Sequence, residues 1–232
     1  MYMDESTEVP EPSQVTSHLT ALLGSEVSAP ILLQIAIYWI EQSYSVIYIR
    51  PTPHTKLPPD IHGVSTIQEN LQQFSNLLRF LYLPSWSDLL QFLFCVHEAA
   101  SVPHVVLVEN LNFYCAMEPG VPPDESHAAL ILASLKDSVT ACARKLRTST
   151  HLVCSFDHVA HKDFKLHPVF DIFFSDSIWT VKEHPDNKVT LSRSRDIFDK
   201  DDTDEILFVK TQDKILYFEG IKKIFAHWTY HS

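Results

Sequence analysis

The interpretation of this chain depends on the stretch Leu22–Ile31, LLGSEVSAPI. It closes one apolar run, turns at a single glycine and leads into ILLQIAIYWI, a long apolar helix candidate. This is the layout of the phosphate-binding loop G-x-x-x-x-G-K-[S/T], which lies between a strand and a helix. Counted from Gly24, however, the second glycine position holds Ala29, the lysine position Pro30 and the hydroxyl position Ile31. The stretch therefore has the frame of such a loop without its reactive groups.

The missing groups carry the chemistry of a phosphate-binding loop. In such loops, backbone amides hold the phosphates, the lysine neutralises them and the hydroxyl ligates magnesium. Pro30 has neither a side-chain charge nor an N–H, and Ile31 cannot ligate a metal. The whole chain has only four glycines, where average usage gives roughly sixteen. Few sites therefore remain where amides can converge on a phosphate. The degenerate nucleotide-binding loop consists of Gly24, Ser25, Glu26, Val27, Ser28, Ala29, Pro30 and Ile31.

Composition limits the class of protein. With 232 residues, of which 45% are hydrophobic, the chain can bury a sizeable core. Its net charge of −11 argues against a simple cationic nucleic-acid-binding domain. No apolar run reaches the roughly 20 residues that span a bilayer, and the acidic MYMDESTEVPEPSQ is unlike a signal or transit peptide. We expect a soluble intracellular protein, without membrane contact, whose scattered cysteines stay reduced.

Strand and helix patterns alternate along the chain. We expect residues 1–16 to be a disordered acidic leader and residues 17–232 to form one domain. Continuous β-branched strands alternating with helices predict an α/β fold, with a mostly parallel sheet and helices on both faces. From about residue 176, two alternating pairs of runs predict C-terminal antiparallel hairpins. The expected strands are SHLTALL, YSVIYIRP, LLRFLYLPS, PHVVLVEN and STHLVCSF; the expected helices are 30–43, 66–77, 126–147 and WSDLLQFLFCVHEAA, which Ser85 caps.

The middle of the chain carries a more specific likeness. LLRFLYLPSWSDLLQFLFCVHEA, followed by PHVVLVENLNFY, resembles the corresponding stretch of the SWIM-domain-associated recombinase paralogues. These are small RecA-like ATPase subunits of the metazoan Shu complex in homologous recombination. The likeness covers about residues 20–156, and it implies a RecA-like P-loop NTPase core and a nuclear protein of DNA repair. The residues that carry it are Arg79, Phe80, Tyr82, Pro84, Ser85, Leu89, Leu90, His97, Glu98 and Ala99, and the strand that closes at Glu109.

This chain departs from that family at the catalytic positions. Members with an intact loop have the glycine, lysine and hydroxyl residue that are absent here, and an aspartate in place of the Walker B-like Glu109. The family's water-activating glutamate, on the strand expected beside the loop strand, corresponds to Arg50. The resemblance therefore implies a non-catalytic subunit without a cofactor, which binds a SWIM-type zinc-finger protein and promotes recombinase filament assembly. Any zinc belongs to the partner, because this chain lacks the C-x-C…C-x-H pattern.

Two other interpretations stay open. One is a weak, DNA-stimulated ATPase of the same family, in which the amides of residues 25–29 and the helix dipole still hold ATP and magnesium. The other is an α/β interaction protein unrelated to recombination. For single-stranded DNA, the resemblance implies contacts from loops after the later strands, and the candidate residues are Arg144, Lys145, Arg147, Lys162 and Lys165.

A zinc site in the segment HLVCSFDHVAHKDFKLH is disfavoured. The segment offers His151, Cys154, His158, His161 and His167 as ligands. His151 and Cys154 are three residues apart on a predicted strand, so their side chains face opposite sides of the sheet. We therefore expect no metal site in this chain.

Overall fold

The computed structural model describes residues 15–24, 27–56, 58, 61–62, 76–118, 121, 123–157, 167–174, 177–194, 202–213 and 215–225. Of the leader expected at residues 1–16, only the last two residues belong to this part of the chain. Of the helix expected at residues 66–77, again only the last two residues are described, and they form a turn.

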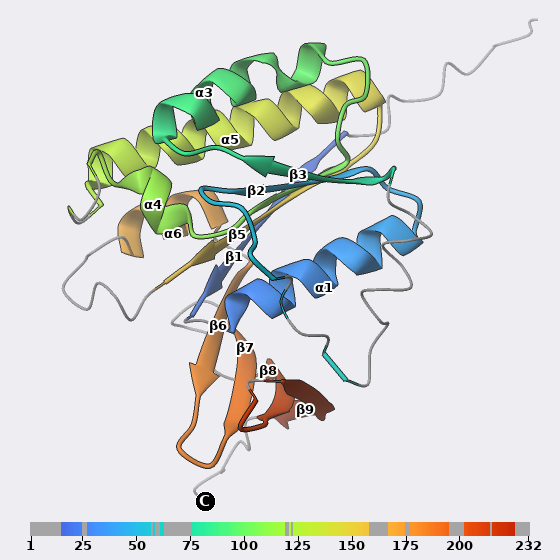
Figure 1. Cartoon of the computed structure of the whole chain (residues 1–232), viewed down its shortest axis with the longest axis vertical. Helices are drawn as coiled ribbons and strands as arrows, with labels where there is room; N and C mark the ends of the chain where they lie inside the picture. Colours follow the sequence, from blue (N-terminus) through green and yellow to red (C-terminus); the bar gives the residue numbers. More distant parts are fainter. Residues whose placement is uncertain are drawn as a thin grey trace, which may run out of the picture.

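One nine-stranded sheet organises the chain, in the order β3-β2-β4-β5-β1-β6-β7-β8-β9 (Figure 1). Strands β3, β2, β4, β5, β1 and β6 are parallel, and the remaining pairs are antiparallel. These observations confirm the α/β fold with a mostly parallel core and C-terminal antiparallel strands. The strands are β1 (Ser17–Leu23), β2 (Val46–Arg50), β3 (Leu78–Tyr82), β4 (Val105–Val108), β5 (Thr150–Phe156), β6 (Ile178–Glu183), β7 (Lys188–Ser194), β8 (Asp202–Lys210) and β9 (Leu216–Phe225).

The sequences of the central strands β2 and β4 are unbroken apolar runs because both faces of these strands are buried. All four residues of β4 and the first four of β2 are buried, because helices cover both faces of the sheet there. The edge strand β3 instead mixes buried and exposed residues. Burial on two faces removes the polar alternation that a half-exposed strand shows.

Helices cover both faces of the sheet, as predicted (Figure 1). Among the described helices, α1 (Ser28–Glu41) packs on one face with the core residues of β2, β4 and β8. The opposite face carries α3 (Trp86–Cys95), α4 (Leu111–Cys115), α5 (Glu125–Leu146) and α6 (His167–Phe174). A 3-10 turn, Val96–Glu98, follows α3, so the expected helix there is shorter than its apolar pattern. No described helix is long and apolar enough to cross a membrane.

Two local predictions need correction. Helix α1 spans Ser28–Glu41 rather than residues 30–43; Pro30 is tolerated within its first turn, where N–H groups have no intrahelical partner. Strand β2 does not lie beside β1, since β4 and β5 separate them. Two strands therefore lie between Arg50 and the loop strand. The hairpins expected after residue 176 are present, and they extend the same sheet because β6 pairs in parallel with β1.

Candidate functional site

The carboxyl ends of the parallel strands meet at one edge of the sheet, and this carboxyl edge is the candidate site. Gly24 follows β1, Arg50 ends β2, Glu109 follows β4 and Asp157 follows β5. In open α/β sheets, ligands bind in the crevice outside the carboxyl ends of the strands. The edge therefore brings the start of the degenerate loop and the Walker B-like acid to the same side of the molecule.

Gly24 is explained by packing rather than by phosphate binding. Its N–H donates to the Phe156 carbonyl at 3.0 Å, which continues the pairing of β1 with β5. A Cβ atom at this position would lie 2.5 Å from Cβ of Val181 on β6. Only glycine therefore lets β6 approach β1 this closely. Ser25 and Glu26 lie outside the described residues.

The first turn of α1 belongs to the core. Val27, Ser28, Pro30 and Ile31 are buried, and Ala29 is half-buried. Ile31 packs in the hydrophobic cluster between α1 and the sheet. No side chain caps the helix. The positions of the absent lysine and hydroxyl residue are thus occupied by apolar side chains that stabilise packing.

Both carboxylate oxygens of Glu109 are engaged by β2 and the segment that follows it. The Tyr48 hydroxyl donates to Oε2 at 2.6 Å, and Arg50 Nη2 lies 3.3 Å from Oε1. His54 Nε2 is 3.8 Å from Oε2. The Arg50 and Glu109 side chains are only 15% and 13% exposed. The register of β2 against β4 sets this contact, because the Glu109 N–H donates to the Ile49 carbonyl at 2.9 Å.

Two members of this cluster, Tyr48 and His54, have pKa values shifted towards their neutral forms. Burial and the neighbouring Glu109 charge raise the pKa of Tyr48, so its hydroxyl stays a donor. Burial and the Arg50 charge lower the pKa of His54, and its neutral Nδ1 accepts a hydrogen bond from Arg50 Nη1. The Glu109 carboxylate is therefore neutralised by Arg50. A magnesium ion, which binds through carboxylate oxygens, would have to displace that guanidinium.

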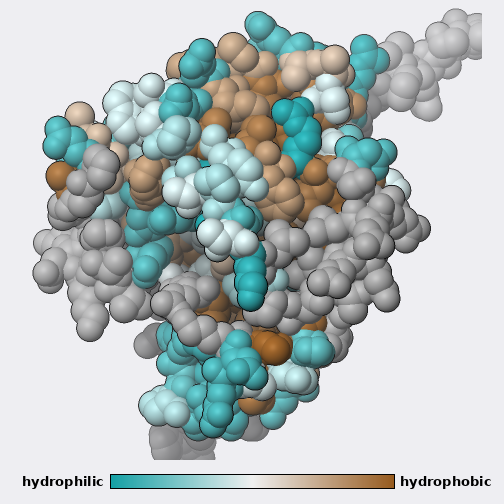
Figure 2. All heavy atoms as spheres, in the orientation of Figure 1, coloured by the Kyte–Doolittle hydropathy of each residue, from teal (hydrophilic) through white to brown (hydrophobic). Residues whose placement is uncertain are grey.

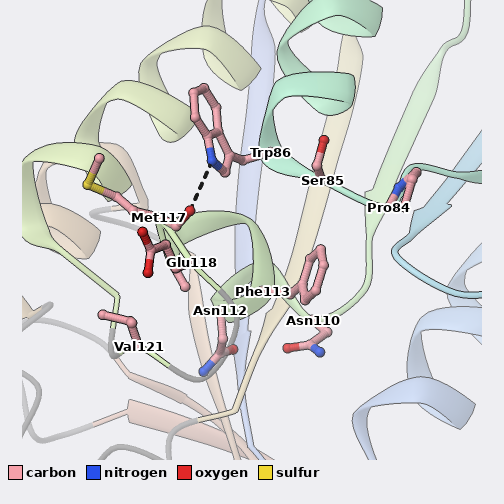
Figure 3. A pocket seen from close by; sticks show the side chains of 10 residues that line it. Pro84, Ser85, Trp86, Asn110, Asn112, Phe113, Met117, Glu118 and Val121 are labelled. Atoms are coloured by element: carbon pink, nitrogen blue, oxygen red, sulfur yellow. Dashed lines mark hydrogen bonds between the residues drawn. The ribbon is translucent and has the colours of Figure 1, made fainter.

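A cavity of about 320 Å³ opens at the same edge, between the start of α3 and α4 (Figure 3). The Trp86 Nε1–H donates to the Met117 carbonyl at 3.3 Å, which joins the two sides of the cavity. Asn112 is held in place because it donates to the Asp157 carbonyl at 2.8 Å and accepts from the Asp157 N–H at 2.7 Å. The lining includes Trp86, Asn110, Asn112, Phe113, Met117 and Glu118.

The chemistry of this cavity does not suit a phosphate. Among the described residues of its lining, Glu118 is charged and none is a cation. The N–H of Asp88 in α3 already has a partner, because it donates to the Ser85 side chain at 3.1 Å. Aromatic faces beside one carboxylate favour a cationic or neutral side chain. Asn110 adopts a left-handed conformation, φ 57° and ψ 58°, a strained state that is enriched at functional sites.

The candidate DNA-binding residues do not gather at the carboxyl edge. Arg144 and Lys145 lie in the last turn of α5 and Arg147 caps it, just before the amino end of β5. This is the opposite edge of the sheet from Gly24 and Glu109. Lys145 is already engaged, since its Nζ donates to the Ala99 carbonyl at 3.0 Å. Lys162 and Lys165 lie outside the described residues.

Of the disfavoured zinc ligands, His151 and Cys154 lie on opposite faces of the sheet, as the strand spacing predicts. His151 stacks on His18, with ring centroids 5.0 Å apart, and lies against Trp39 of α1. Cys154 is buried in the cluster on the other face of the sheet. His158, His161 and the His167 side chain lie outside the described residues. Within the part of the chain that the structure describes, no three His, Cys, Asp or Glu residues are placed to hold a metal ion.

Sequence reasoning missed the aromatic cavity and the ion pair of Arg50 with Glu109. Helix α4 is only five residues long, so its sequence shows no helical period. The predicted Ser85 cap was the one local sequence signal that marked the start of α3, where the cavity opens. No protein-family model matches the chain, and a search of curated proteins finds no match either.

Proposed function

We propose that this chain is a non-catalytic, RecA-like recombinase paralogue of the nucleus. It acts in homologous-recombination DNA repair by binding a SWIM-type zinc-finger protein and promoting recombinase filament assembly. The observation that carries the non-catalytic part is the Arg50–Glu109 pair, in which Nη2 lies 3.3 Å from Oε1. The acid that would organise magnesium in a RecA-like ATPase is used here as a structural counter-ion.

The RecA-like assignment draws on the resemblance of residues 20–156 and on the framework of the fold. The strand–turn–helix unit of β1 and α1 and the acid after β4 occur within a parallel sheet that helices cover on both faces. Pro30 and Ile31 replace the lysine and the metal-ligating hydroxyl. Losing both groups removes several kcal/mol of transition-state stabilisation. ATP hydrolysis above background is therefore not expected.

A protein partner is supported by apolar side chains that the chain leaves at its surface. Phe94 of α3 is 63% exposed, Leu130 of α5 50% and Tyr82 of β3 43%. In Figure 2, hydrophobic atoms gather in the upper part of the view, over α3, α5 and β3, and hydrophilic atoms dominate at the lower end. Extended apolar surface of this kind marks interaction sites. Among the described residues, no strand pairs with the outer edge of β3, which leaves an edge that a partner can cover.

Co-expression tests this function. The full chain is produced with a SWIM-domain zinc-finger protein, and elution volume, melting temperature and ATP titration are measured. We expect the two chains to co-elute and the melting temperature to rise, because a partner that binds only the folded state stabilises it by mass action. A monodisperse lone chain whose melting temperature ignores the partner contradicts the proposal. ATP turnover that Glu109→Ala abolishes contradicts its non-catalytic part and favours the weak ATPase.

A further inference from the structure

Two aromatic side chains line the cavity between the starts of α3 and α4, Trp86 from α3 and Phe113 from α4 (Figure 3). The Trp86 N–H is already used, since it donates to the Met117 carbonyl at 3.3 Å. The Trp86 ring also packs edge-on against His127 of α5, with ring centroids 4.9 Å apart. Trp86 therefore offers a ligand the π system of its ring rather than a hydrogen-bond donor.

Hydrogen bonds on either side of Phe113 hold α4 in place. The Asn110 N–H donates to Ser155 Oγ of β5 at 3.0 Å. The Tyr114 hydroxyl donates to the Leu83 carbonyl, just before α3, at 2.9 Å. The cavity is therefore formed before a ligand arrives, and the entropic cost of ordering its walls does not oppose binding.

Three carboxylates lie in or beside the cavity. Glu118 lines it with an exposed side chain. Asp88 in the first turn of α3 and Asp124, which caps α5, lie at the neighbouring helix starts. Positions 119, 120 and 122 are outside the described residues, and in the sequence they are proline and glycine, which carry no charge. Such a site attracts cationic groups, and the net charge of −11 strengthens this attraction.

We propose that this cavity binds the guanidinium group of an arginine side chain supplied by a protein partner. Its volume of about 320 Å³ is at the lower end of the roughly 300–1,000 Å³ that ligand sites occupy, which suits one long side chain. A planar guanidinium stacks on an aromatic face and at the same time donates hydrogen bonds to a carboxylate. The compact ammonium group of lysine combines these contacts less well.

Exposed apolar side chains in the lining indicate that the arginine belongs to a protein. Met117 is 59% exposed and Val121 46%, and both line the cavity. Residues that flank the arginine in a partner can cover them. Contacts that dominate the energy of protein interfaces are enriched in tryptophan and arginine. The identity of the partner, a SWIM-type protein, rests on the proposed function, whereas the arginine site rests on geometry and charge.

A single arginine side chain, offered as N-acetyl-arginine methylamide, tests the site by NMR. The full chain is labelled with nitrogen-15, and Trp86→Phe identifies which of the four tryptophan indole N–H signals belongs to Trp86. We expect this signal to shift saturably with the arginine derivative and to stay in place with the neutral N-acetyl-citrulline methylamide. A wild-type signal that does not move, or that moves equally with citrulline, overturns the proposal. Equal binding of N-acetyl-lysine methylamide overturns the choice of arginine.

Two variants with matched controls locate the site. Glu118→Gln should weaken binding of the arginine derivative about fivefold, the size of a well-formed exposed ion pair. Glu98→Gln removes the same charge from an exposed position beyond the far end of α3 and should change little. Phe113→Leu should weaken binding about threefold, the size of one cation–π contact, and Phe94→Leu, at an exposed position of α3, is its control. Equal effects of a variant and its control overturn the site.

Capture of the SWIM-domain protein by the same preparations separates this inference from the proposed function. We expect Glu118→Gln to weaken capture and Glu98→Gln to leave it unchanged. Capture by a wild type that does not bind the arginine derivative overturns the inference and leaves the proposed function standing, and so does capture that Glu118→Gln leaves unchanged. Binding of the arginine derivative that depends on Glu118, without capture, supports the cavity and contradicts the proposed function.

Discussion

Two strand–turn–helix units of this molecule start in the same way and end differently. The unit of β1 and α1 has the frame of a nucleotide loop, but its helix has no side-chain cap and its first turn is buried. The unit of β3 and α3 has no such motif. Its helix is capped by Ser85, whose Oγ accepts the Asp88 N–H at 3.1 Å, and it opens onto the aromatic cavity.

The difference shows that a strand–turn–helix unit can keep the layout of a nucleotide-binding loop without the groups that bind a phosphate. A helix N-terminus attracts anions only where its free N–H groups reach the ligand. In α1, apolar residues fill that space and make it part of the core. In α3, the N-terminal turn stays accessible while its own polar side chains occupy it. The N-terminus of neither helix therefore favours a phosphate.

The largest effect is expected at the carboxyl edge beside α1. Arg50→Met leaves the Glu109 carboxylate without its counter-ion, and breaking a largely buried pair costs about 3 kcal/mol. For a chain of this size, we expect the melting temperature to fall by roughly 6–12 °C. Lys56→Met, at an exposed position nearby, is the control and should change little. A melting temperature equal to that of the control means that the pair does not hold Glu109.

Gly24→Ala should follow in size. The new Cβ would meet Val181 at 2.5 Å, and overpacking of this kind costs about 1–3 kcal/mol. Gly220→Ala is a control of the same chemistry, because a Cβ there meets no atom within 4 Å. Urea unfolding measures both variants. If the two glycines tolerate alanine equally, the packing explanation of Gly24 is wrong.

Ser85→Ala should cost about 1 kcal/mol, the value of a lost N-cap. The neighbouring Ser87→Ala has no cap to lose and serves as the control. The counterpart in α1 is Val27→Ser, which supplies a capping side chain at an uncapped helix. We expect no stabilisation by Val27→Ser, because the gain of a cap is offset by loss of a buried apolar side chain. Stabilisation in urea unfolding would show that the start of α1 is more open than its burial indicates.

The last effect concerns pH and the other end of α1. Burial, together with the nearby His18, lowers the pKa of His151 to about 4, below its ordinary value of about 6.5. The unfolded chain therefore binds a proton that the folded chain does not, and stability declines as pH falls from about 6.5 towards 4. His151→Gln should flatten this decline between pH 7 and pH 5 in thermal melts. An unchanged pH profile would assign the decline to other groups.

Much of the local structure was predictable from residue patterns. SHLTALL matches β1 residue for residue, and the Ser85 cap and α5 agree with the structure to within one residue. The strand neighbours of β2 were predicted wrongly, because strand adjacency is set by contacts between distant segments. Helices α4 and α6, five and eight residues long, are too short for a period to be recognised.

The sequence by itself determined which chemical groups the chain lacks. No arrangement can replace the lysine and hydroxyl that Pro30 and Ile31 displace, since side-chain chemistry does not depend on the fold. Only the tertiary structure decided what the remaining groups do. Gly24 meets Val181, Glu109 pairs with Arg50, and Trp86 shares a cavity with Glu118. Each of these contacts joins residues that are distant in sequence, and strand register and helix packing, which local propensity does not encode, bring them together.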